Sequence, residues 1–347
     1  MKRWLKRIAL SAFGLLVLTT IIGATYEAFA RAQVVKAFPA PGRLVDVGGG
    51  RRIQLDCSGS GIPVVVFESG LDTLGSLSWA AVHDAIAKTT RACAYSRAGI
   101  MWSDADPRPF SSGHLAEDLH NALAAADETA PYVMVGHSLG GPYVLGYAAR
   151  YGDEVAGIVF VDASHPEQVA RLRAAAGKDL DQQLGIASLG AALAWTGIVR
   201  LLDPSELPSN APHTIAAPTA AWFPNSLPAL VQELRGIDAT LAVVVTHRRL
   251  GDRPIIVLTH GEKNPPEALR AMQVTAAQAE RMDAAWREMQ NDMATWSTNS
   301  RHEVVAGASH YIQFDQAGVV VRAVQDVVRN VRQREAADVA PTPNARH

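Results

Sequence analysis

The sequence predicts an α/β fold: an open, mostly parallel sheet of eight strands with helices on both faces. From Arg43 onward, short runs of apolar or β-branched residues alternate with helical stretches, as in a parallel sheet with crossover helices. The runs are continuously apolar, which is typical of strands covered on both faces. The chain has 347 residues, of which 48% are apolar and 19% charged. This composition can bury a core, and it excludes a disordered chain or a polytopic membrane protein.

Eight strands are expected in this part of the chain. RLVDV, GGG and RRIQLDC predict an opening hairpin, and the other six runs lie at 64–69, 91–96, 132–137, 157–163, 254–260 and 302–307. Two amphipathic helices stand out between them. One, HLAEDLHNALAAA, has apolar side chains at helical spacing, and the other repeats an apolar residue every three or four positions. We expect the second set to form the core face of its helix: Met282, Trp286, Met289, Met293 and Trp296.

The first 30 residues predict a membrane anchor or a signal segment. Four basic residues in MKRWLKR precede an uncharged, mostly apolar stretch from Ile8 to Tyr26. About 20 apolar residues span a bilayer, whereas a cleaved signal has roughly 7 to 15, so length favours an uncleaved single-pass anchor. The alternative is cleavage after Ala28-Phe29-Ala30, which would leave a secreted or periplasmic protein. In both cases the basic flank stays inside and the rest is exported.

The remaining boundaries follow from where the alternation starts, breaks and stops. We expect a linker at 31–42, one domain at 43–335 and a disordered tail at 336–347, where the apolar period ends. Between about 164 and 250 no convincing buried strand occurs, which predicts an inserted helical segment after the sixth strand. Such an insertion would lie over the carboxyl edge of the sheet, where α/β proteins bind ligands, as a lid.

Charge and cysteine usage exclude several functions. With a net charge of -2, the chain has no field to attract polyanions, so no nucleic-acid partner is expected. Cys57 and Cys93 lack metal-ligand spacing, so we interpret them as buried thiols, with a disulfide left open and no zinc site expected. The sequence contains no phosphate loop, HExxH motif or dinucleotide fingerprint, so no cofactor and no metal are expected.

Residues 136–141, GHSLGG, match the pattern G-x-S-x-G between a predicted strand and a predicted helix. A serine at such a turn has a strained backbone, and the positions two before and two after it must be small. Gly136 and Gly140 meet that need, and the following helix directs its free N–H groups toward the serine. Ser138 is therefore the candidate nucleophile, while its neighbour His137 is expected to pack beside it.

With this motif, the chain resembles the α/β-hydrolase superfamily, specifically its lidded esterase- and lipase-like serine hydrolases, from about Arg43 to Glu335. Residues 95–104, YSRAGIMWSD, are similar to that superfamily's Y-D-R-x-G-x-G-x-S segment, with Ser96 and Met101 as departures. The superfamily has its triad in the order serine, acid, histidine. The resemblance therefore implies His310, in GASHYI just after the last strand, as the general base.

The triad acid and the oxyanion hole are also implied by the resemblance. In many relatives the acid follows the seventh strand as G-x-x-D, but here an amide, Asn264, takes that place. Other relatives place the acid after the sixth strand, where this chain has Asp162; Glu262 is the alternative, and Asp162 could also simply cap the end of its strand. The oxyanion hole would take one backbone N–H from Leu139 and, by position in the loop after the third strand, one from Leu71.

These residues predict a serine hydrolase that cleaves an apolar ester or related carbonyl substrate through an acyl-enzyme. Within the resemblance, a serine nucleophile excludes haloalkane dehalogenases and epoxide hydrolases, which have an aspartate at that position. A helical lid is equally compatible with amide, thioester or carbon–carbon bond hydrolysis. A catalytically silent hydrolase-like domain that binds a small molecule or a protein is the alternative from another class.

Overall fold

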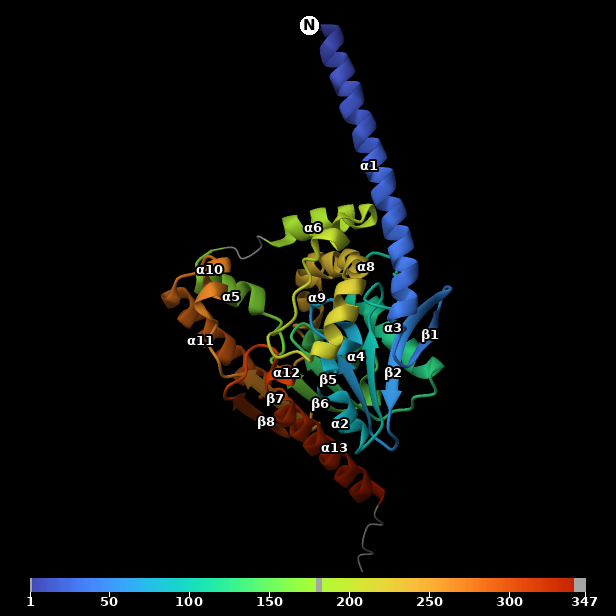
Figure 1. Cartoon of the computed structure of the whole chain (residues 1–347). Helices are drawn as coiled ribbons and strands as arrows, with labels where there is room; N and C mark the ends of the chain where they lie inside the picture. The colour runs from blue at the N-terminus through green and yellow to red at the C-terminus, as the bar shows by residue number, and fades with distance from the viewer. Residues whose placement is uncertain (1, 179–182, 340–347) are drawn as a thin grey trace, which may run out of the picture.

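The computed structural model describes residues 2–178 and 183–339, and it contains one eight-stranded sheet (Figure 1). The strand order is β1-β2-β4-β3-β5-β6-β7-β8, with β1 and β2 antiparallel and all pairs from β4 to β8 parallel. The predicted fold class is therefore confirmed. The strands are β1 Arg43–Gly48, β2 Arg51–Ser58, β3 Val64–Glu68, β4 Ala92–Ser96, β5 Tyr132–His137, β6 Val155–Val161, β7 Ile255–His260 and β8 Ser300–Val305.

Two apolar layers hold helices against the sheet. One face packs on α3 (Ser112–Ala125) and α4 (Gly140–Arg150), and the other packs on α2 (His83–Ala87) and α13 (Ala317–Val339). The central strands β3 to β5 are buried along their whole length, because both of their faces are covered. The connection from β7 to β8 carries α10 (Pro266–Ala271) and α11 (Ala276–Met293), and α12 (Ile312–Asp315) follows β8.

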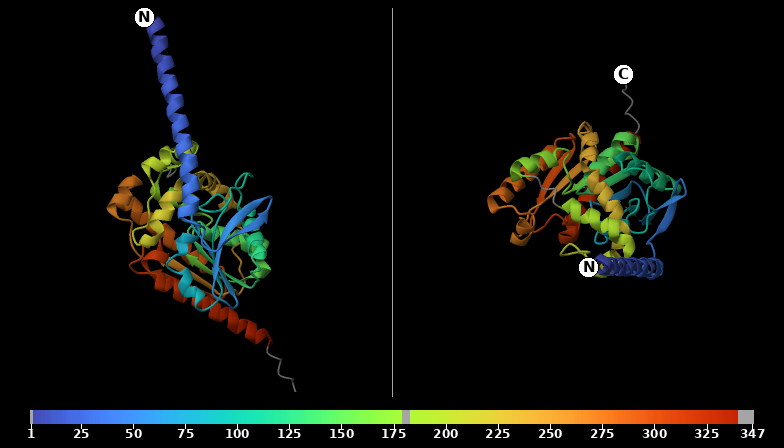
Figure 2. Two further views of the ribbon diagram at one scale, coloured as in Figure 1. Left: turned by 45° about the vertical axis from the view of Figure 1, so that its right-hand side comes forward. Right: turned by 90° about the horizontal axis from the view of Figure 1, so that it is seen from above.

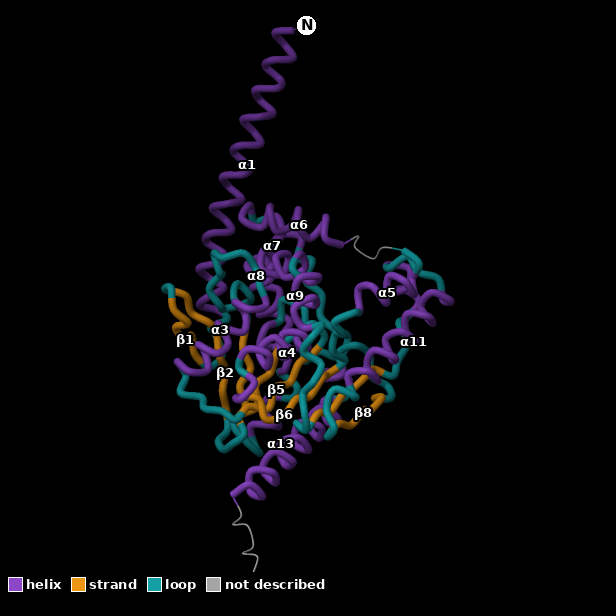
Figure 3. Tube along the Cα trace, turned by 180° about the vertical axis from the view of Figure 1, so that it is seen from behind, coloured by secondary structure: helices purple, strands orange, loops and turns teal. Residues whose placement is uncertain are grey.

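The connection from β6 to β7 is helical, as the sequence predicts. Five α-helices lie in its described part: α5 Gln168–Ala176, α6 Gln183–Leu193, α7 Ile198–Leu202, α8 Ala216–Arg235 and α9 Ile237–Val244. The 3-10 helices η3 (Ala194–Thr196) and η4 (His213–Ile215) occur within the same connection, and η1 (Gly75–Trp79) and η2 (Gly152–Glu154) lie elsewhere. In the cartoon, α6 and α8 lie toward the N-terminal helix, beyond the end of the sheet (Figures 1 and 3).

The N-terminal helix α1 (Lys2–Ala37) is longer than the expected anchor and runs through most of the predicted linker. Its first half projects away from the body, while its second half lies against it (Figures 1 and 2). Val34 is buried there beside Trp102 and Trp222, whose indole N–H groups both donate to the carbonyl of Phe38. These contacts explain why the helix continues beyond residue 31. Among the described helices, α1 alone is long and apolar enough to cross a membrane.

The expectation of a tail from residue 336 is wrong at its start, because α13 continues to Val339; residues 340–347 lie outside the described chain. The valines of α13 repeat along one face and pack against the sheet as far as Val331. The last turns, up to Val339, continue the helix from that packed stretch.

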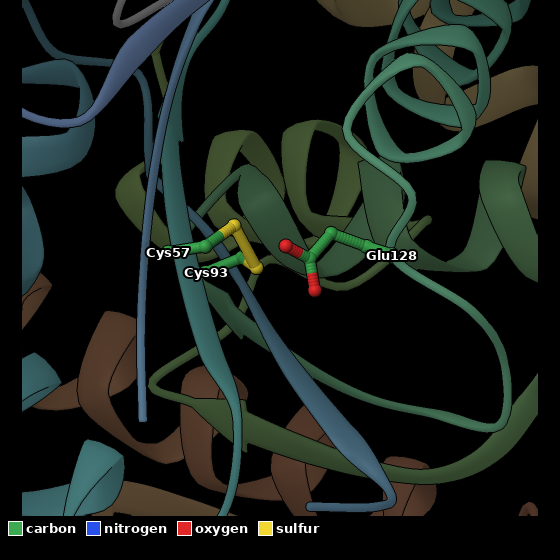
Figure 4. A group of neighbouring side chains, drawn as sticks. All are labelled: Cys57, Cys93 and Glu128. Atoms are coloured by element: carbon green, nitrogen blue, oxygen red, sulfur yellow. A yellow bond between two sulfur atoms is a disulfide. The ribbon is translucent and has the colours of Figure 1, made fainter. Parts of the chain in front are cut away.

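The two cysteines are not free thiols. Cys57 on β2 and Cys93 on β4 face each other in antiparallel register, with Cα atoms 4.1 Å apart, and form a disulfide (Figure 4). Their ladder position brings the side chains together, which strand patterns alone do not reveal because they do not give the pairing. Glu128 lies beside the sulfur atoms, but its carboxylate is paired with Arg91, 2.5 Å from Nη2. Sulfurs joined to each other offer no thiolate to a metal ion.

Candidate active site

The turn at Ser138 joins β5 to α4 and has the strained geometry that the motif predicts. Ser138 has φ = +51°, a value that residues other than glycine rarely adopt. A Cβ on Gly136 would lie 2.8 Å from the carbonyl carbon and oxygen of Gly140, and one on Gly140 would lie 2.6 Å from the carbonyl oxygen of Glu68. Only glycine fits at these two positions, so the strand and helix can approach closely enough to present the serine.

Asp162 and His310 lie together at the carboxyl edge of the sheet. Asp162 follows β6 and is completely buried, and His310 follows β8 with a side chain that is 40% exposed. Asp162 Oδ2 lies 2.5 Å from His310 Nδ1, although the two residues are 148 positions apart in sequence. Glu262, the alternative acid, is exposed in the loop after β7, where its backbone N–H donates to the carbonyl of Ala308. Asn264 is also exposed.

Asp162 accepts further hydrogen bonds from two residues that the sequence analysis did not assign to the site. The backbone N–H and the Nδ1 of His260 lie 3.1 Å and 2.9 Å from Oδ1, and the indole N–H of Trp286 donates to the same oxygen at 2.9 Å. Burial alone would raise the pKa of Asp162, but hydrogen bonds and charge interactions with His260 and His310 hold it well below its usual range. Asp162 is therefore an anion with fixed donors around both oxygens.

The same contacts act on His260 in the opposite direction. Burial lowers the pKa of His260, but the hydrogen bond and charge of Asp162 outweigh this effect and leave it above the ordinary value. The sequence does offer one indication that His260 belongs to the site: it ends a predicted strand at the same sheet edge as Asp162. Trp286 was predicted to lie on a core face. Met289, Met293 and Trp296 are indeed buried, whereas Trp286 is only half-buried and contacts Asp162.

His137 connects the serine turn to the histidine loop. Its ring lies 4.7 Å from that of His310, and its Nε2 lies 2.9 Å from the carbonyl oxygen of His310, so Nε2 carries the hydrogen. Burial lowers the pKa of His137 to about 3, which keeps the ring neutral. His137 thus packs between Ser138, the candidate nucleophile, and His310. Among the described residues, the Ser138 hydroxyl makes no hydrogen bond to the His310 ring; such contacts often tighten only when substrate binds.

The two candidate oxyanion donors lie in one apolar cluster. Leu139 is buried against Tyr143, and Leu71 is packed on the same cluster. Leu139 directly precedes α4, and Leu71 lies in the loop after β3. In the described chain neither backbone N–H donates to another backbone group, so both are available to an incoming oxygen.

Arg97 fixes the loop that carries Leu71. Its guanidinium donates to the carbonyl oxygens of Ser69 at 2.8 Å and Gly70 at 2.7 Å, and it pairs with Glu68 at 2.9 Å. It also forms a two-pronged ion pair with Glu233 of α8, at 2.9 Å and 2.7 Å. Arg97 and Glu233 are both buried, so helix α8 is connected through one cation to the loop that carries Leu71. Sequence analysis noted the arginine only as part of YSRAG and missed its partners.

A cavity of about 270 Å³ lies on the α8 side of this ion pair. Phe110 and Leu115 line it, and the same two side chains pack on the cluster of Leu71 and Leu139. Ser138, Asp162 and His310 are not among its lining residues. Arg97, Phe110 and Leu115 thus contact both this cavity and the part of the chain around Leu71 and Leu139.

Comparison with known proteins agrees with this architecture. Residues 62–197 match the family model described as "alpha/beta hydrolase fold". An epoxide hydrolase mutant from Vigna radiata superposes with a TM-score of 0.61 at 16% identity, covering 83% of this chain and 98% of that one. A thermophilic esterase from Thermogutta terrifontis gives a TM-score of 0.52 at 19% identity, with coverages of 83% and 97%. Together with the strand order and the turn at Ser138, these matches show that the chain has the α/β-hydrolase fold.

An uncharacterized protein of Bacillus subtilis, YqjL, is 25% identical over 270 residues, which cover 78% of this chain and 85% of that protein. Similarity to the fungal sequences is local. An uncharacterized protein of Schizosaccharomyces pombe is 50% identical over 74 residues, which is 21% of this chain. The chain spans only 14% to 18% of the length of three fungal proteins that it matches.

Proposed function

We propose that the protein is a serine hydrolase that cleaves an ester or related carbonyl substrate, with Ser138 as nucleophile, His310 as general base and Asp162 as the acid. The observation that carries the proposal is the 2.5 Å contact between Asp162 Oδ2 and His310 Nδ1, on a loop packed through His137 against the strained serine turn. A buried carboxylate on Nδ1 leaves Nε2 free to take a proton.

The reaction then follows from these positions. The Ser138 oxygen attacks the substrate carbonyl carbon while His310 Nε2 takes the hydroxyl proton, and Asp162 stabilises the imidazolium. The N–H groups of Leu71 and Leu139 hold the oxyanion. His310 returns the proton to the departing alcohol, leaving an acyl-enzyme, and a water molecule activated by the same ring releases the acid. No step needs a cofactor.

A substrate with an apolar part fits the surroundings. The two proposed oxyanion donors belong to residues of an apolar cluster that also contains Tyr143, Leu241, Phe110 and Leu115. The charges of Arg97, which lies 5.0 Å from the Tyr143 ring centroid, are paired with Glu68 and Glu233. Similarity in fold to both an esterase and an epoxide hydrolase leaves the bond that is cleaved open. A serine at position 138 favours acyl transfer over epoxide opening, because a serine ester of a carbonyl substrate is readily hydrolysed through the oxyanion hole.

For its location, we infer a single-pass anchor with the hydrolase domain on the exported side. The apolar helix α1 and the basic residues before it support this orientation. The disulfide between Cys57 and Cys93 is independent support, since such bonds persist mainly in oxidising compartments.

The test is labelling of the full chain with a fluorophosphonate, followed by identification of the modified residue by mass spectrometry. We expect the label on Ser138, and Ser138→Ala should lose both labelling and hydrolysis of p-nitrophenyl esters, with Ser209→Ala, an exposed serine, as the matched control. Residual ester hydrolysis above about one part in a thousand in Ser138→Ala would place the nucleophile elsewhere. Turnover of styrene oxide, without ester turnover, would favour the epoxide alternative.

A further inference from the structure

The inserted segment presents an apolar surface to solvent next to the membrane-anchor helix. The surface consists of α6, η3 and α7, and from Leu184 to Val199 the chain has no ionisable side chain. Its large apolar side chains are unusually exposed: Ile186 by 81%, Leu189 by 62%, Trp195 by 55%, Leu201 by 71% and Leu202 by 73%. We refer to these five side chains as the cap surface. So many exposed large apolar side chains in one segment indicate a contact with a partner or a membrane.

Direct contacts fix the cap surface to α1. Gly23 approaches η3 so closely that a Cβ there would lie 2.2 Å from the carbonyl oxygen of Thr196. Glu27 of α1 is buried, and its carboxylate accepts from Arg200 of α7 at 2.8 Å and 2.9 Å. The height of the cap surface along α1 is therefore set by Gly23 and Glu27.

That height coincides with the expected edge of a bilayer. The uncharged stretch from Ile8 to Tyr26 has 19 residues, and at about 1.5 Å per residue it is about 28 Å long, close to the thickness of a hydrocarbon core. Glu27 is the first charged residue after it. A bilayer crossed by α1 would thus end at the level of Glu27, where α7 contacts this helix, and η3 contacts α1 at Gly23, in the last turn of the apolar stretch.

The orientation of the segment also suits a membrane surface. In Figures 1 and 3, α6 runs crosswise to α1 on the side of the body from which α1 leaves, so α6 would lie along the plane of a bilayer that α1 crosses. Three exposed side chains of α6, at positions 186, 189 and 193, are three or four residues apart and share one face. Trp195 adds an indole, a side chain enriched at membrane interfaces.

We propose that the cap surface is immersed in the interface of the same bilayer that α1 spans, so that the inserted segment contacts lipid directly. Resting on the proposed function, this placement also specifies the substrate class: an ester dissolved in the membrane, which enters from the lipid side of the insertion. The continuity of the surface with an anchor helix commits it to lipid rather than to a protein partner.

The placement is tested on the full chain in phosphatidylcholine nanodiscs, without reductant so that the native disulfide stays closed. Single variants Leu189→Cys and Leu202→Cys carry the fluorophore NBD, and brominated acyl chains serve as quencher. Leu15→Cys in α1 is the positive control, and Asp84→Cys, on α2, is the negative control. We expect quenching at 15, 189 and 202 and none at 84. Quenching at 15 without quenching at 189 and 202 overturns the proposal, and so does the absence of quenching at 15.

The substrate class has a separate test. Leu189→Asp/Leu202→Asp should lower kcat/KM for a long-chain ester dissolved in the nanodisc at least tenfold, while kcat/KM for soluble p-nitrophenyl acetate stays within twofold. Val304→Asp, an exposed apolar site on β8, is the matched control. Equal activity of the double variant on both substrates overturns the membrane-dissolved substrate. If the protein is not an ester hydrolase at all, the parent should turn over neither ester, and the fluorescence quenching should still occur. That result is therefore distinct from failure of the lipid placement.

Discussion

Replacing Asp162 by asparagine perturbs the proposed site with almost no change of shape. The amide oxygen should occupy the position of Oδ1, because the backbone N–H of His260 and the indole N–H of Trp286 both donate there. The amide NH₂ then faces His310 Nδ1 at the position of Oδ2. His310 must accept this hydrogen bond, so its own hydrogen moves to Nε2, and Nε2 can no longer take the serine proton.

The expected loss is large because the tautomer is wrong and the stabilising charge is absent. The precedent in serine triads is about 10⁴ in kcat, which corresponds to about 5.5 kcal/mol of transition-state stabilisation. We expect this loss in Asp162→Asn, measured as kcat for p-nitrophenyl butyrate with the full chain in detergent. Glu262→Gln is the matched control; it should stay within about threefold of the parent, since Glu262 is exposed.

Near-UV circular dichroism of Asp162→Asn separates loss of catalysis from loss of fold. The assignment of the acid is refuted if the folded Asp162→Asn variant keeps kcat within about tenfold of the parent while Glu262→Gln is the inactive one. Asp162 would then be no more than a strand-end residue that holds two histidines.

Three further predictions follow from buried polar contacts. The pKa of His137 is about 3 in the folded protein and near 6.5 when unfolded, so the parent loses stability as pH falls below 6.5. Between pH 6 and pH 4, the free energy of unfolding measured in urea should fall by about 2.5 kcal/mol more in the parent than in His137→Gln. Equal losses in the two proteins would contradict this prediction. Trp286→Phe removes one donor to Asp162 but keeps an aromatic ring, so kcat should fall about tenfold with KM nearly unchanged; an unaltered kcat argues against the role of the indole. Arg97→Met leaves Glu68 and Glu233 buried without their cation, and the free energy of unfolding should fall by about 3–5 kcal/mol; a fall below about 1 kcal/mol would show that the network contributes little.

The sheet could be predicted well from the sequence because each central strand is covered on both faces. A continuous apolar run is then both the local signal and the physical requirement, and the expected run at 132–137 coincides with β5. The bounds of a strand are less well predicted where one end of the run is less constrained. The strand expected at 157–163 is observed as β6 at Val155–Val161. That shift places Asp162 just beyond the strand, with φ = +43°.

Pairings between distant segments could not be predicted, since no local pattern specifies them. The disulfide depends on the register of β2 against β4, and the pairing of Arg97 with Glu233 depends on how α8 docks, 136 positions away. Each is a contact made by tertiary packing alone. The apolar N-terminal helix was predicted from its composition and length. Its attachment to the insertion through Glu27 and Arg200 was not, because an isolated glutamate after an apolar stretch carries no information about its partner.

The proposed assignment of Asp162 as the acid accounts for the departure from G-x-x-D after the seventh strand. With Asp162 at the end of β6, the neighbouring end of β7 supplies donors to it, namely the backbone N–H and the ring of His260, while the N–H of Asp162 donates back to Leu258. A second carboxylate at the end of β7 would face Asp162 as a like charge in a buried place and raise the pKa of one of them. His260 is the residue at the end of β7 that contacts Asp162, whereas Asn264 is exposed in the loop that follows. The departure from the G-x-x-D motif is thus what we expect if Asp162 is the triad acid, as proposed.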